Sequence, residues 1–403
     1  MPVLKKLFCN WEESDMVEWK TLEEIANYRR GSFPQPYGKE EWYNGEGAMP
    51  FVQVADVEES AMCLKATTKQ YISKLAMPMS VYVPQGSIVV TLQGSIGKVA
   101  ITQYDSYVDR TLGIFTGFKT NIDKKYFTYQ LHKIFSEKKE KARGGTIKTI
   151  TKEEFSHFQI PIPSKEEQTR IVEILDTFTA SIANLKEQIK ERRKQYEYYR
   201  DQLLDLEGKD GVEMKTLGEV CSFRNGFAFK SGKFKETGLP IIRITNISNN
   251  NIDLEDCKYF DIDDYRGINF TDFAIVKGDI LIAMSGATTG KIGEYKACSI
   301  AYLNQRVGKF IPDVEKLHKR FLYHYLLGKN QEIYMLAGGG AQPNLSSNKL
   351  MSELYIPIPA ILEQTRIVTI LDQFEASIAN LEAQLKEREK QYEYYRNQLL
   401  TFE

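Results

Sequence analysis

The sequence has few cysteines, and they lie far apart along the chain. The five cysteines form no CxxC pair, so we expect reduced thiols in the cytoplasm, without a disulfide framework or a zinc site. No apolar run approaches the roughly 18 residues that a membrane-spanning helix needs. The stretch MPVLKKLFCNWEESDM has no apolar core and carries acids early, so we expect no signal peptide.

The chain also lacks a charge excess of either sign. Its 53 Lys and Arg residues balance 54 Asp and Glu residues, for a formal net charge of −1. A protein that held nucleic acid by bulk charge alone would be clearly basic. If this chain reads DNA, its basic groups are arranged locally or a partner supplies contacts to phosphate.

Motifs for common catalytic sites are missing as well. The four histidines form no HExxH spacing, and GxSxG does not occur. GSIGKV and GATTGKIG resemble a phosphate-binding loop, but the spacing is too short and Val or Ile follows the Lys. Two interpretations of these glycine hairpins remain open. The glycines serve tight β turns, or the hairpin backbone approaches a nucleic-acid groove.

What the sequence does contain is an internal repeat. Residues 164–207 and 360–403 are identical at about 31 of 44 positions, and each segment follows the tetrapeptide IPIP. Fainter echoes link the segments outside, such as EWKTLEEIANYRRG with EMKTLGEVCSFRNG. The chain is therefore two copies of one unit, in which a diverged domain precedes a closely matched segment.

The matched segments have the apolar spacing of long helices that pair along a heptad seam. The seam positions are Ile171, Leu175, Phe178, Ile182, Leu185, Ile189, Tyr196, Tyr199 and Leu203, and Ile367, Leu371, Phe374, Ile378, Leu381, Leu385, Tyr392, Tyr395 and Leu399. Each helix would be roughly 60 Å long. A parallel pair would force the intervening domain to span that length, so we predict an antiparallel coiled coil with pseudo-two-fold symmetry.

Arg192 and Arg388 interrupt the seam at equivalent places. One interpretation is that each arginine reaches out to solvent or pairs with a Glu of the facing helix. The other is that each is a polar residue that sets the register of the pair.

The two diverged domains read as α+β. β-branched strands alternate with glycine turns, and helices are predicted at about 124–141 and 315–336. The predicted organisation is a domain at 1–159, a long helix at 160–207, a second domain at 208–355 and a second long helix at 356–403.

This layout closely resembles the specificity subunit of type I restriction–modification systems. The resemblance covers essentially the whole chain and rests on the repeat, on IPIP with EQTRIVEILD or EQTRIVTILD, on GDILIAMSGATTGKIG and on GGAQPNLS. The first domain departs from the last two motifs, with QGSIVVTLQGSIGK and GGTIKTIT in their places. Roles carried over to its loops are correspondingly weaker.

The resemblance implies that the domains are target-recognition domains, each reading one half of a split, asymmetric sequence in double-stranded DNA. The helices would set the unread gap and bind two modification (methyltransferase) subunits. Restriction (translocase) subunits would complete the complex. This chain would hold no cofactor and carry no catalysis, with S-adenosylmethionine, ATP and Mg²⁺ used by the partner subunits.

For base reading we expect polar side chains near glycine turns and strand ends, because Arg suits guanine and Asn or Gln suits adenine. The candidates in the first domain are Arg29, Arg30, Gln53, Gln93, Ser95, Lys98 and Lys148. Those in the second domain are Arg224, Asn225, Arg243, Asn246, Ser285, Thr288, Lys291, Gln342 and Asn344. Arg110 and Arg306, which lie within predicted strands, are expected to be internal supports instead.

The heptapeptide KQYEYYR ends both helices. Two of its tyrosines fall on the seam, whereas Tyr198 and Tyr394 fall at an outward position. With Arg200 and Arg396 nearby, they suggest a docking surface for a partner helix.

Two other functions compete with DNA specificity. A fused methyltransferase would need an [ND]PP[YF] motif, which is absent, and a coiled-coil scaffold would have no DNA function.

Overall fold

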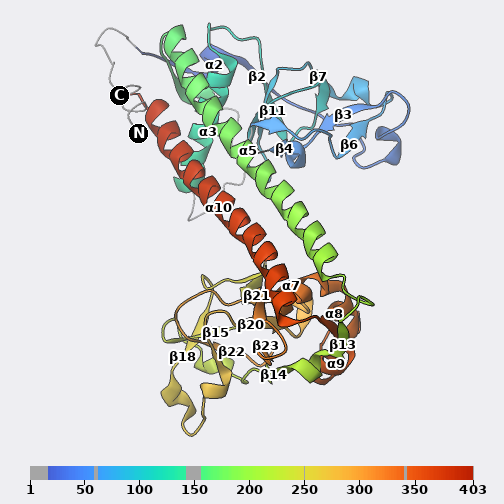
Figure 1. Cartoon of the computed structure of the whole chain (residues 1–403). Helices are drawn as coiled ribbons and strands as arrows, with labels where there is room; N and C mark the ends of the chain where they lie inside the picture. Colours follow the sequence, from blue (N-terminus) through green and yellow to red (C-terminus); the bar gives the residue numbers. More distant parts are fainter. Residues whose placement is uncertain (1–16, 59–61, 142–155, 249, 340–342, 403) are drawn as a thin grey trace. The chain divides into compact units, whose positions relative to one another are not determined.

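The computed structural model describes residues 17–58, 62–141, 156–248, 250–339 and 343–402. The chain forms two compact units (Figure 1). Unit 1 comprises Met1–Glu187 and Glu382–Glu403, and unit 2 comprises Gln188–Leu381. Each unit therefore contains one of the two diverged domains and one segment of each long helix. The domain limits predicted at 159, 207 and 355 stay predictions, because the units divide the chain inside the helices.

Unit 1 is built on two sheets. The six-stranded sheet has the order β2-β11-β8-β9-β5-β4, and the four-stranded sheet has the order β6-β3-β10-β7. The strands of the first sheet are Asn27–Arg30 (β2), Leu112–Thr116 (β11), Ile88–Thr91 (β8), Val99–Ile101 (β9), Cys63–Leu64 (β5) and Val57–Glu58 (β4). Those of the second are Gln70–Ile72 (β6), Met49–Val52 (β3), Ser106–Val108 (β10) and Val81–Val83 (β7).

Unit 2 repeats this topology strand for strand. Its six-stranded sheet has the order β14-β23-β20-β21-β17-β16, and its four-stranded sheet has the order β18-β15-β22-β19. The first sheet contains Cys221–Asn225 (β14), Val307–Pro312 (β23), Ile280–Ala283 (β20), Ile292–Glu294 (β21), Asn251–Ile252 (β17) and Ile247–Ser248 (β16). The second contains Lys258–Phe260 (β18), Leu239–Ile242 (β15), Ala301–Leu303 (β22) and Ala274–Ile275 (β19).

The faint sequence echo at the start of each domain forms the same local structure. Thr21 and Glu24 close a capping box on the short helix α2 (Leu22–Ile25), and Thr216 and Glu219 do so on α6 (Leu217–Val220). The strand before each helix, β1 (Glu18–Thr21) or β13 (Glu213–Thr216), pairs with the IPIP strand, β12 (Gln159–Ile162) or β24 (Tyr355–Ile358). The two ends of each domain are thereby joined.

The helices that the sequence predicts in the two domains are present, with one difference. The first predicted helix is α3, Lys124–Lys141. The second is divided at Lys329 into α7 (Lys319–Gly328) and α8 (Asn330–Leu336). Gly328, with its low helix propensity, stands at this break. A further short helix, α9 (Ser347–Glu353), precedes β24.

The long helices are α5 (Lys165–Leu204) and α10 (Ile361–Leu399). In unit 1 the rings of Phe178 and Tyr395 lie 5.3 Å apart, and further along Lys186 pairs with Glu389 at 3.2 Å. Residue numbers rise on one helix as they fall on the other, so the predicted antiparallel pairing is confirmed within this unit. In unit 2, Tyr199 and Phe374 stack with ring centroids 5.4 Å apart.

The seam residues are buried most deeply where the helices meet the domains. Ile171 and Leu175 have no exposed surface in unit 1, and Ile367 and Leu371 have none in unit 2. Full burial of such a side chain stabilises a fold by about 1.5–3 kcal/mol. The same residues belong to the domain cores, so each helix start is an integral part of its unit.

The two seam arginines adopt an arrangement that neither prediction described. The Arg388 guanidinium lies 5.6 Å from the ring centroid of Phe178 in unit 1. Arg192 lies 5.8 Å from the ring of Phe374 in unit 2. Each arginine thus sits over an aromatic ring of the facing helix, where the positive charge meets the negative face of the ring.

The end of α10 returns to the first domain. Leu400 and Phe402 are buried in the core of unit 1, while Glu403 lies outside the described residues. The four cysteines in the described ranges are free, and burial raises the pKa of the Cys221 thiol to about 12. None of the described helices is both long enough and apolar enough to cross a membrane.

Candidate nucleic-acid interface

One end of the six-stranded sheet in unit 2 gathers the loops that the sequence singled out. Strand β14 ends there at Asn225, opposite Gly308 at the start of β23. Strand β20 ends there at Ala283, opposite Val307. The next strand, β21, begins there after Lys291, whose carbonyl accepts from the Ala283 N–H. We call this the strand-end surface of unit 2.

Two motifs about 50 residues apart in sequence meet on this surface. The Gly286 N–H donates to the carbonyl of Pro343 at 3.2 Å, and Thr289 Oγ1 donates to the same carbonyl at 3.1 Å. Ser285 and Asn344 form a β-bridge. Gly286 has a φ of +77°, a conformation that favours glycine, which explains this residue within the GATTG turn.

Two hydroxyls of the GATTG loop have no hydrogen-bond partner among the described residues. These are Ser285 Oγ, in a side chain that is buried, and Thr288 Oγ1, in a half-buried residue. A buried polar atom without a partner costs about 1–3 kcal/mol, and such groups in native proteins call for an explanation. Because both oxygens are buried, a group from outside the chain could reach them only if the loop moved.

The other candidates of unit 2 have different settings. Asn225 Nδ2 donates to Ser347 Oγ at 3.2 Å, and Arg224 lies 3.6 Å from Asp272, with its side chain 44% exposed. Lys291 is exposed. These side chains can exchange a surface partner for a DNA partner at small cost, since exposed ion pairs are weak.

Asn246 does not fit the predicted base-reading role. It is 2% exposed, and its amide donates to the carbonyls of Asp253 and Asp256. Its Oδ1 accepts from the N–H of Arg243, which closes the turn after β15. The Arg243 guanidinium also turns inward, with Nη2 donating to the Asp256 carbonyl at 3.2 Å. Both residues build the loop that lies beside the surface.

The equivalent strand-end surface of unit 1 lies where β2 and β8 end and β11 begins. Arg30 pairs with Gly113 across the sheet, and both Arg29 and Arg30 are exposed. Gln93 and Ser95 follow β8 in the glycine turn. The Lys98 N–H donates to Thr91 Oγ1 at 2.9 Å, which folds the turn back on its strand.

Three predicted residues have other neighbours or lie outside the described part of the chain. Gln53 caps a short turn with Asp56, and its Nε2 donates to Gln70 Oε1 at 2.9 Å. Lys148 and Gln342 lie outside the described residues.

The prediction of internal roles for Arg110 and Arg306 was wrong. Arg306 is exposed in the turn before β23, where its carbonyl accepts from the Met284 N–H beside the GATTG loop. Arg110 is exposed at the matching place in unit 1 and lies 4.5 Å from the ring centroid of Phe33. The two strands were predicted as continuous through these arginines, so the tight turn that exposes them was missed.

Comparison with known proteins decides the family. The model of the type I restriction modification DNA specificity domain matches the chain twice, over residues 15–192 and 209–390. The chain belongs to this family. Both strand-end surfaces lie inside the matched ranges.

Relatives and solved structures agree with this family assignment. The type I restriction enzyme EcoR124I/EcoR124II specificity subunit of Escherichia coli is 34% identical over 296 residues, which are 69% of this chain and 70% of that protein. The EcoprrI specificity subunit of Escherichia coli is 27% identical over 379 residues, 89% of this chain and 88% of that protein. The S subunit of a type I restriction–modification system from M. genitalium has the same fold, with a TM-score of 0.60, 16% identity and 98% of both chains covered.

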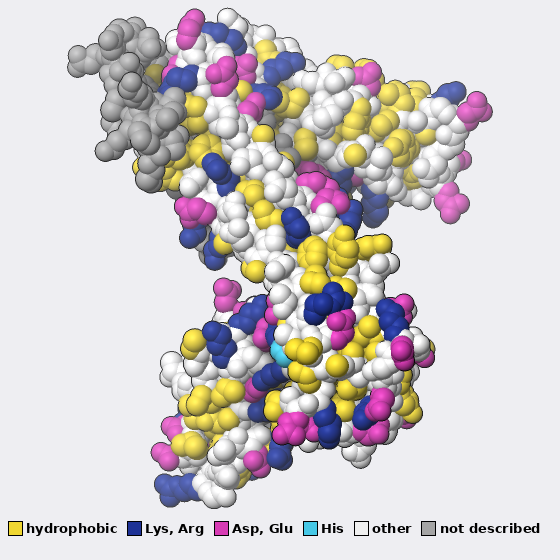
Figure 2. Space-filling model, in the orientation of Figure 1, with side chains coloured by type: hydrophobic (Ala, Val, Ile, Leu, Met, Phe, Trp, Pro, Cys, Tyr) yellow, Lys and Arg dark blue, Asp and Glu magenta, His cyan; other side chains and the backbone are white. Residues whose placement is uncertain are grey.

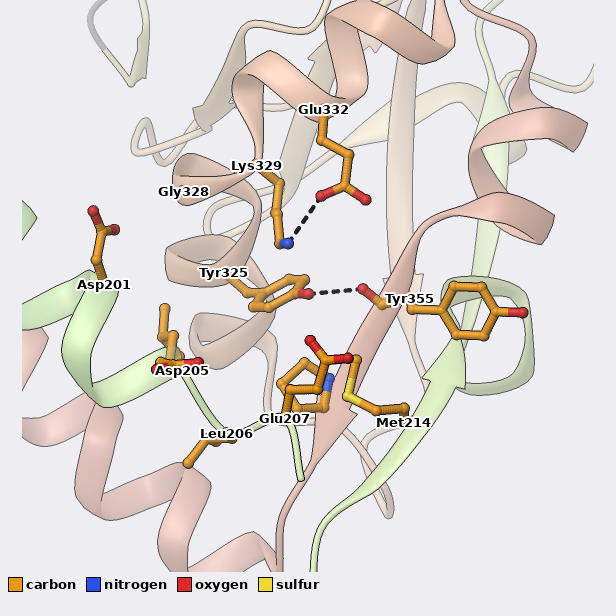
Figure 3. A pocket seen from close by; sticks show the side chains of 12 residues that line it. Asp201, Asp205, Leu206, Glu207, Met214, Tyr325, Gly328, Lys329, Glu332 and Tyr355 are labelled. Carbon is orange, nitrogen blue, oxygen red and sulfur yellow. Dashed lines mark hydrogen bonds and ion pairs between the residues drawn. The ribbon is translucent and has the colours of Figure 1, made fainter. Parts of the chain in front are cut away.

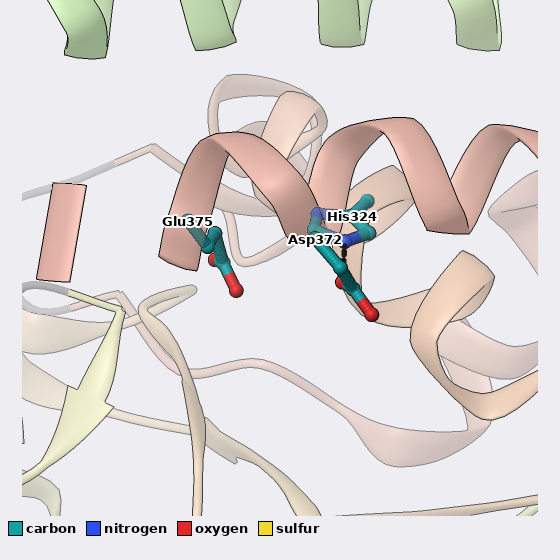
Figure 4. A group of neighbouring side chains, drawn as sticks. All are labelled: His324, Asp372 and Glu375. Carbon is teal, nitrogen blue, oxygen red and sulfur yellow. Dashed lines mark hydrogen bonds and ion pairs between the residues drawn. The ribbon is translucent and has the colours of Figure 1, made fainter. Parts of the chain in front are cut away.

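In this specificity chain, a polar cluster joins the second recognition domain to the helices. Arg320 of α7 donates to Asp372 at 2.6 Å and to Glu375, both on α10, and to Glu294 at 2.8 Å. His324 Nε2 lies 2.8 Å from Asp372 (Figure 4). His324, Asp372 and Glu375 are close enough to hold a metal ion. The Arg320 guanidinium already supplies the positive charge at this place.

The pKa values in the cluster follow from these contacts. Burial opposes charge on Arg320, but hydrogen bonds and attraction from the carboxylates raise its pKa. Burial alone would raise the pKa of Asp372, yet His324 and Arg320 hold it at about 2. In unit 1 the corresponding Asp176 is bound by Lys125 and Tyr129. The domain–helix junction of unit 2 is therefore the more polar one.

The predicted docking residues divide into two kinds. Tyr198 and Tyr394 are 58% and 61% exposed, as expected for an outward position. Arg396 is 5% exposed, bonded to Glu393 and placed over the Tyr392 ring, so it does not fit a partner-facing role. Arg200 is mostly covered as well, with a side chain that is 13% exposed.

Proposed function

We propose that this chain reads one half of a bipartite, asymmetric DNA target with each strand-end surface. The observation that carries the proposal is that the same end of the same six-stranded sheet recurs in both units with different side chains. Unit 1 presents Arg30, Gln93 and Lys98 there, and unit 2 presents Asn225 and Thr288. Two surfaces with the same backbone scaffold but different side chains would read different DNA sequences.

The paired helices would set the unread gap and dock two modification subunits. Their support is the near identity of the two segments, which places Tyr198 and Tyr394 at equivalent exposed positions. Exposed aromatic side chains are favoured anchors in protein interfaces. Two matching anchors would bind two copies of one partner.

Catalysis would belong to the partners. Methyl transfer from S-adenosylmethionine would take place in the modification subunits, and ATP and Mg²⁺ would serve the restriction (translocase) subunits. Acidic and basic side chains are interspersed over the visible face of each unit (Figure 2). A surface of mixed charge supports a division of labour in which this chain selects the sequence and partners clamp the phosphates.

Paired arginine variants test the assignment. The complex with modification subunits would methylate a random-sequence DNA library, and sequencing would report the accepted targets. Arg29→Ala should relax one half of the target and the equivalent Arg224→Ala the other, each at a cost of about 1–3 kcal/mol in discrimination. Arg366→Ala, which removes an exposed helix arginine paired with Glu363, is the matched control. Changes in the same half for both variants, or in neither, would contradict the proposal.

A further inference from the structure

A pocket of about 450 Å³ opens in unit 2 at the C-terminal end of α5 (Figure 3). Tyr325, Met214 and Tyr355 contribute apolar surface to its walls. Met214 and Tyr355 are also 37% and 52% exposed, so apolar surface continues past the mouth of the pocket. The residues that line this pocket belong neither to the strand-end surface nor to the outward tyrosines, so the proposed function gives the pocket no role.

The charge around the pocket is mostly negative. It is lined by four carboxylates, those of Asp201, Asp205, Glu207 and Glu332, and by one ammonium group, that of Lys329. Two carboxylates are already paired. Asp201 accepts from Arg200 at 2.7 Å, and Glu332 pairs with Lys329 at 2.9 Å. No ion pair joins Asp205 or Glu207 to a cation in the described part of the chain, so two negative charges stay uncompensated.

The internal repeat shows what occupies the same place in unit 1. There Lys133 of α3 donates from Nζ to the carbonyl of Leu400 at 3.0 Å and to Thr401 Oγ1 at 2.8 Å. In the repeat, Leu400 and Thr401 correspond to Leu204 and Asp205, which line the pocket. An ammonium group therefore sits at the end of one long helix, and a cavity lies at the end of the other.

The difference between the units comes from two positions of the repeat. Tyr129 and His324 bind equivalent aspartates, and Lys133 follows Tyr129 by the same interval as Gly328 follows His324. Gly328 has no side chain to fill the space. At the end of the helix, unit 2 has Asp205 where unit 1 has the neutral Thr401. Unit 2 therefore has a carboxylate at the place where unit 1 has the ammonium group of Lys133.

We propose that this pocket binds the ammonium group of a lysine side chain from a partner protein. The carboxylates of Asp205 and Glu207 would hold the charge, and the helix carbonyl of Leu204 would accept a hydrogen bond as Leu400 does in unit 1. The ring of Tyr325 and the side chain of Met214 would cover the aliphatic stem. The apolar rim beyond the mouth suits a protein surface better than a free amine.

Two variants of the full chain test the proposal by different routes. Gly328→Lys would fill the pocket from inside, as Lys133 does in unit 1. The variant is sterically allowed, because a Cβ at Gly328 would meet nothing closer than Arg200 Nε at 3.4 Å. Asp205→Asn with Glu207→Gln would remove the charge from two exposed side chains, so the fold should persist. Asp210→Asn with Glu315→Gln, exposed acids of unit 2 outside the pocket, is the control.

Isothermal titration calorimetry would measure the affinity of the full chain for the modification subunit. The choice of this partner rests on the proposed function. Both pocket variants should weaken assembly by roughly tenfold while the control does not, because charge-assisted hydrogen bonds are about twice as strong as neutral ones. Complexes that still form should keep the wild-type DNA target. Methylation without sequence preference in every complex, including wild type, would count against the proposed function and not against the pocket.

The alternatives give different results. If assembly is unchanged but the chain alone binds cadaverine and both pocket variants abolish that binding, the pocket takes a free amine and the partner assignment is wrong. If assembly is unchanged and cadaverine does not bind, the pocket is not an ammonium site.

Discussion

The hydroxyl of Tyr196 lies 2.8 Å from Nδ1 of His324, in a contact where both side chains are buried. Nε2 of His324 faces the Asp372 carboxylate, which only accepts, so the imidazole ring bridges Tyr196 and Asp372. One tyrosine of the KQYEYYR repeat thus fastens the end of α5 to the second recognition domain.

Removing this hydroxyl should destabilise unit 2. Tyr196→Phe leaves the His324 nitrogen buried without its hydrogen-bond partner, which costs about 1–3 kcal/mol in the free energy of unfolding. Urea unfolding followed by circular dichroism would measure the change. Tyr198→Phe, at an exposed neighbour, is the control and should leave the midpoint in place. Equal midpoints for wild type and Tyr196→Phe would refute the fastening role.

Acid should weaken the same junction. Asp372 has a pKa of about 2 in the folded chain, below its ordinary value of 3.8. Its ionised form therefore contributes stability that is present above about pH 4 and is lost as the pH falls toward 2. The difference in unfolding free energy between wild type and Asp372→Asn should be constant from pH 7 to about pH 5 and shrink below about pH 4. A difference that does not change with pH would contradict this account.

The exposed tyrosines should matter for assembly and not for folding. Tyr198→Ala with Tyr394→Ala should weaken binding of the modification subunits by at least about tenfold, since buried aromatic anchors contribute about 2 kcal/mol or more at interfaces. Analytical ultracentrifugation would report the stoichiometry. Gln202→Ala with Gln398→Ala, two exposed and equivalent helix positions, is the control. Normal assembly of the tyrosine variant with two modification subunits would refute the assignment.

Lengthening the helices should lengthen the unread gap. One heptad inserted after Glu187 and another after Leu381 preserves the seam and adds about 10 Å of helix. At about 3.4 Å per base pair, the gap should grow by about three base pairs while both halves of the target stay the same. Sequencing of methylated DNA would show the spacing, and an unchanged gap would rule out the helices as the spacer.

The sequence predicted the repeat, the antiparallel helices and the loop positions well, because apolar periodicity and internal identity report them directly. It failed where a role depends on a single turn. Asn246 is buried and closes a loop, whereas a turn leaves Arg306 exposed. Neither fact follows from residue type. The junction around Arg320 was also missed, since its partners Glu294 and Asp372 lie far apart in the sequence.

The most direct test of the central claim is sequencing of methylated bases in DNA modified by the wild-type chain with its modification subunits. The account predicts one motif, made of two different specified halves separated by a gap of fixed length in which any base is accepted. A continuous motif, two identical halves or methylation without sequence preference would contradict it.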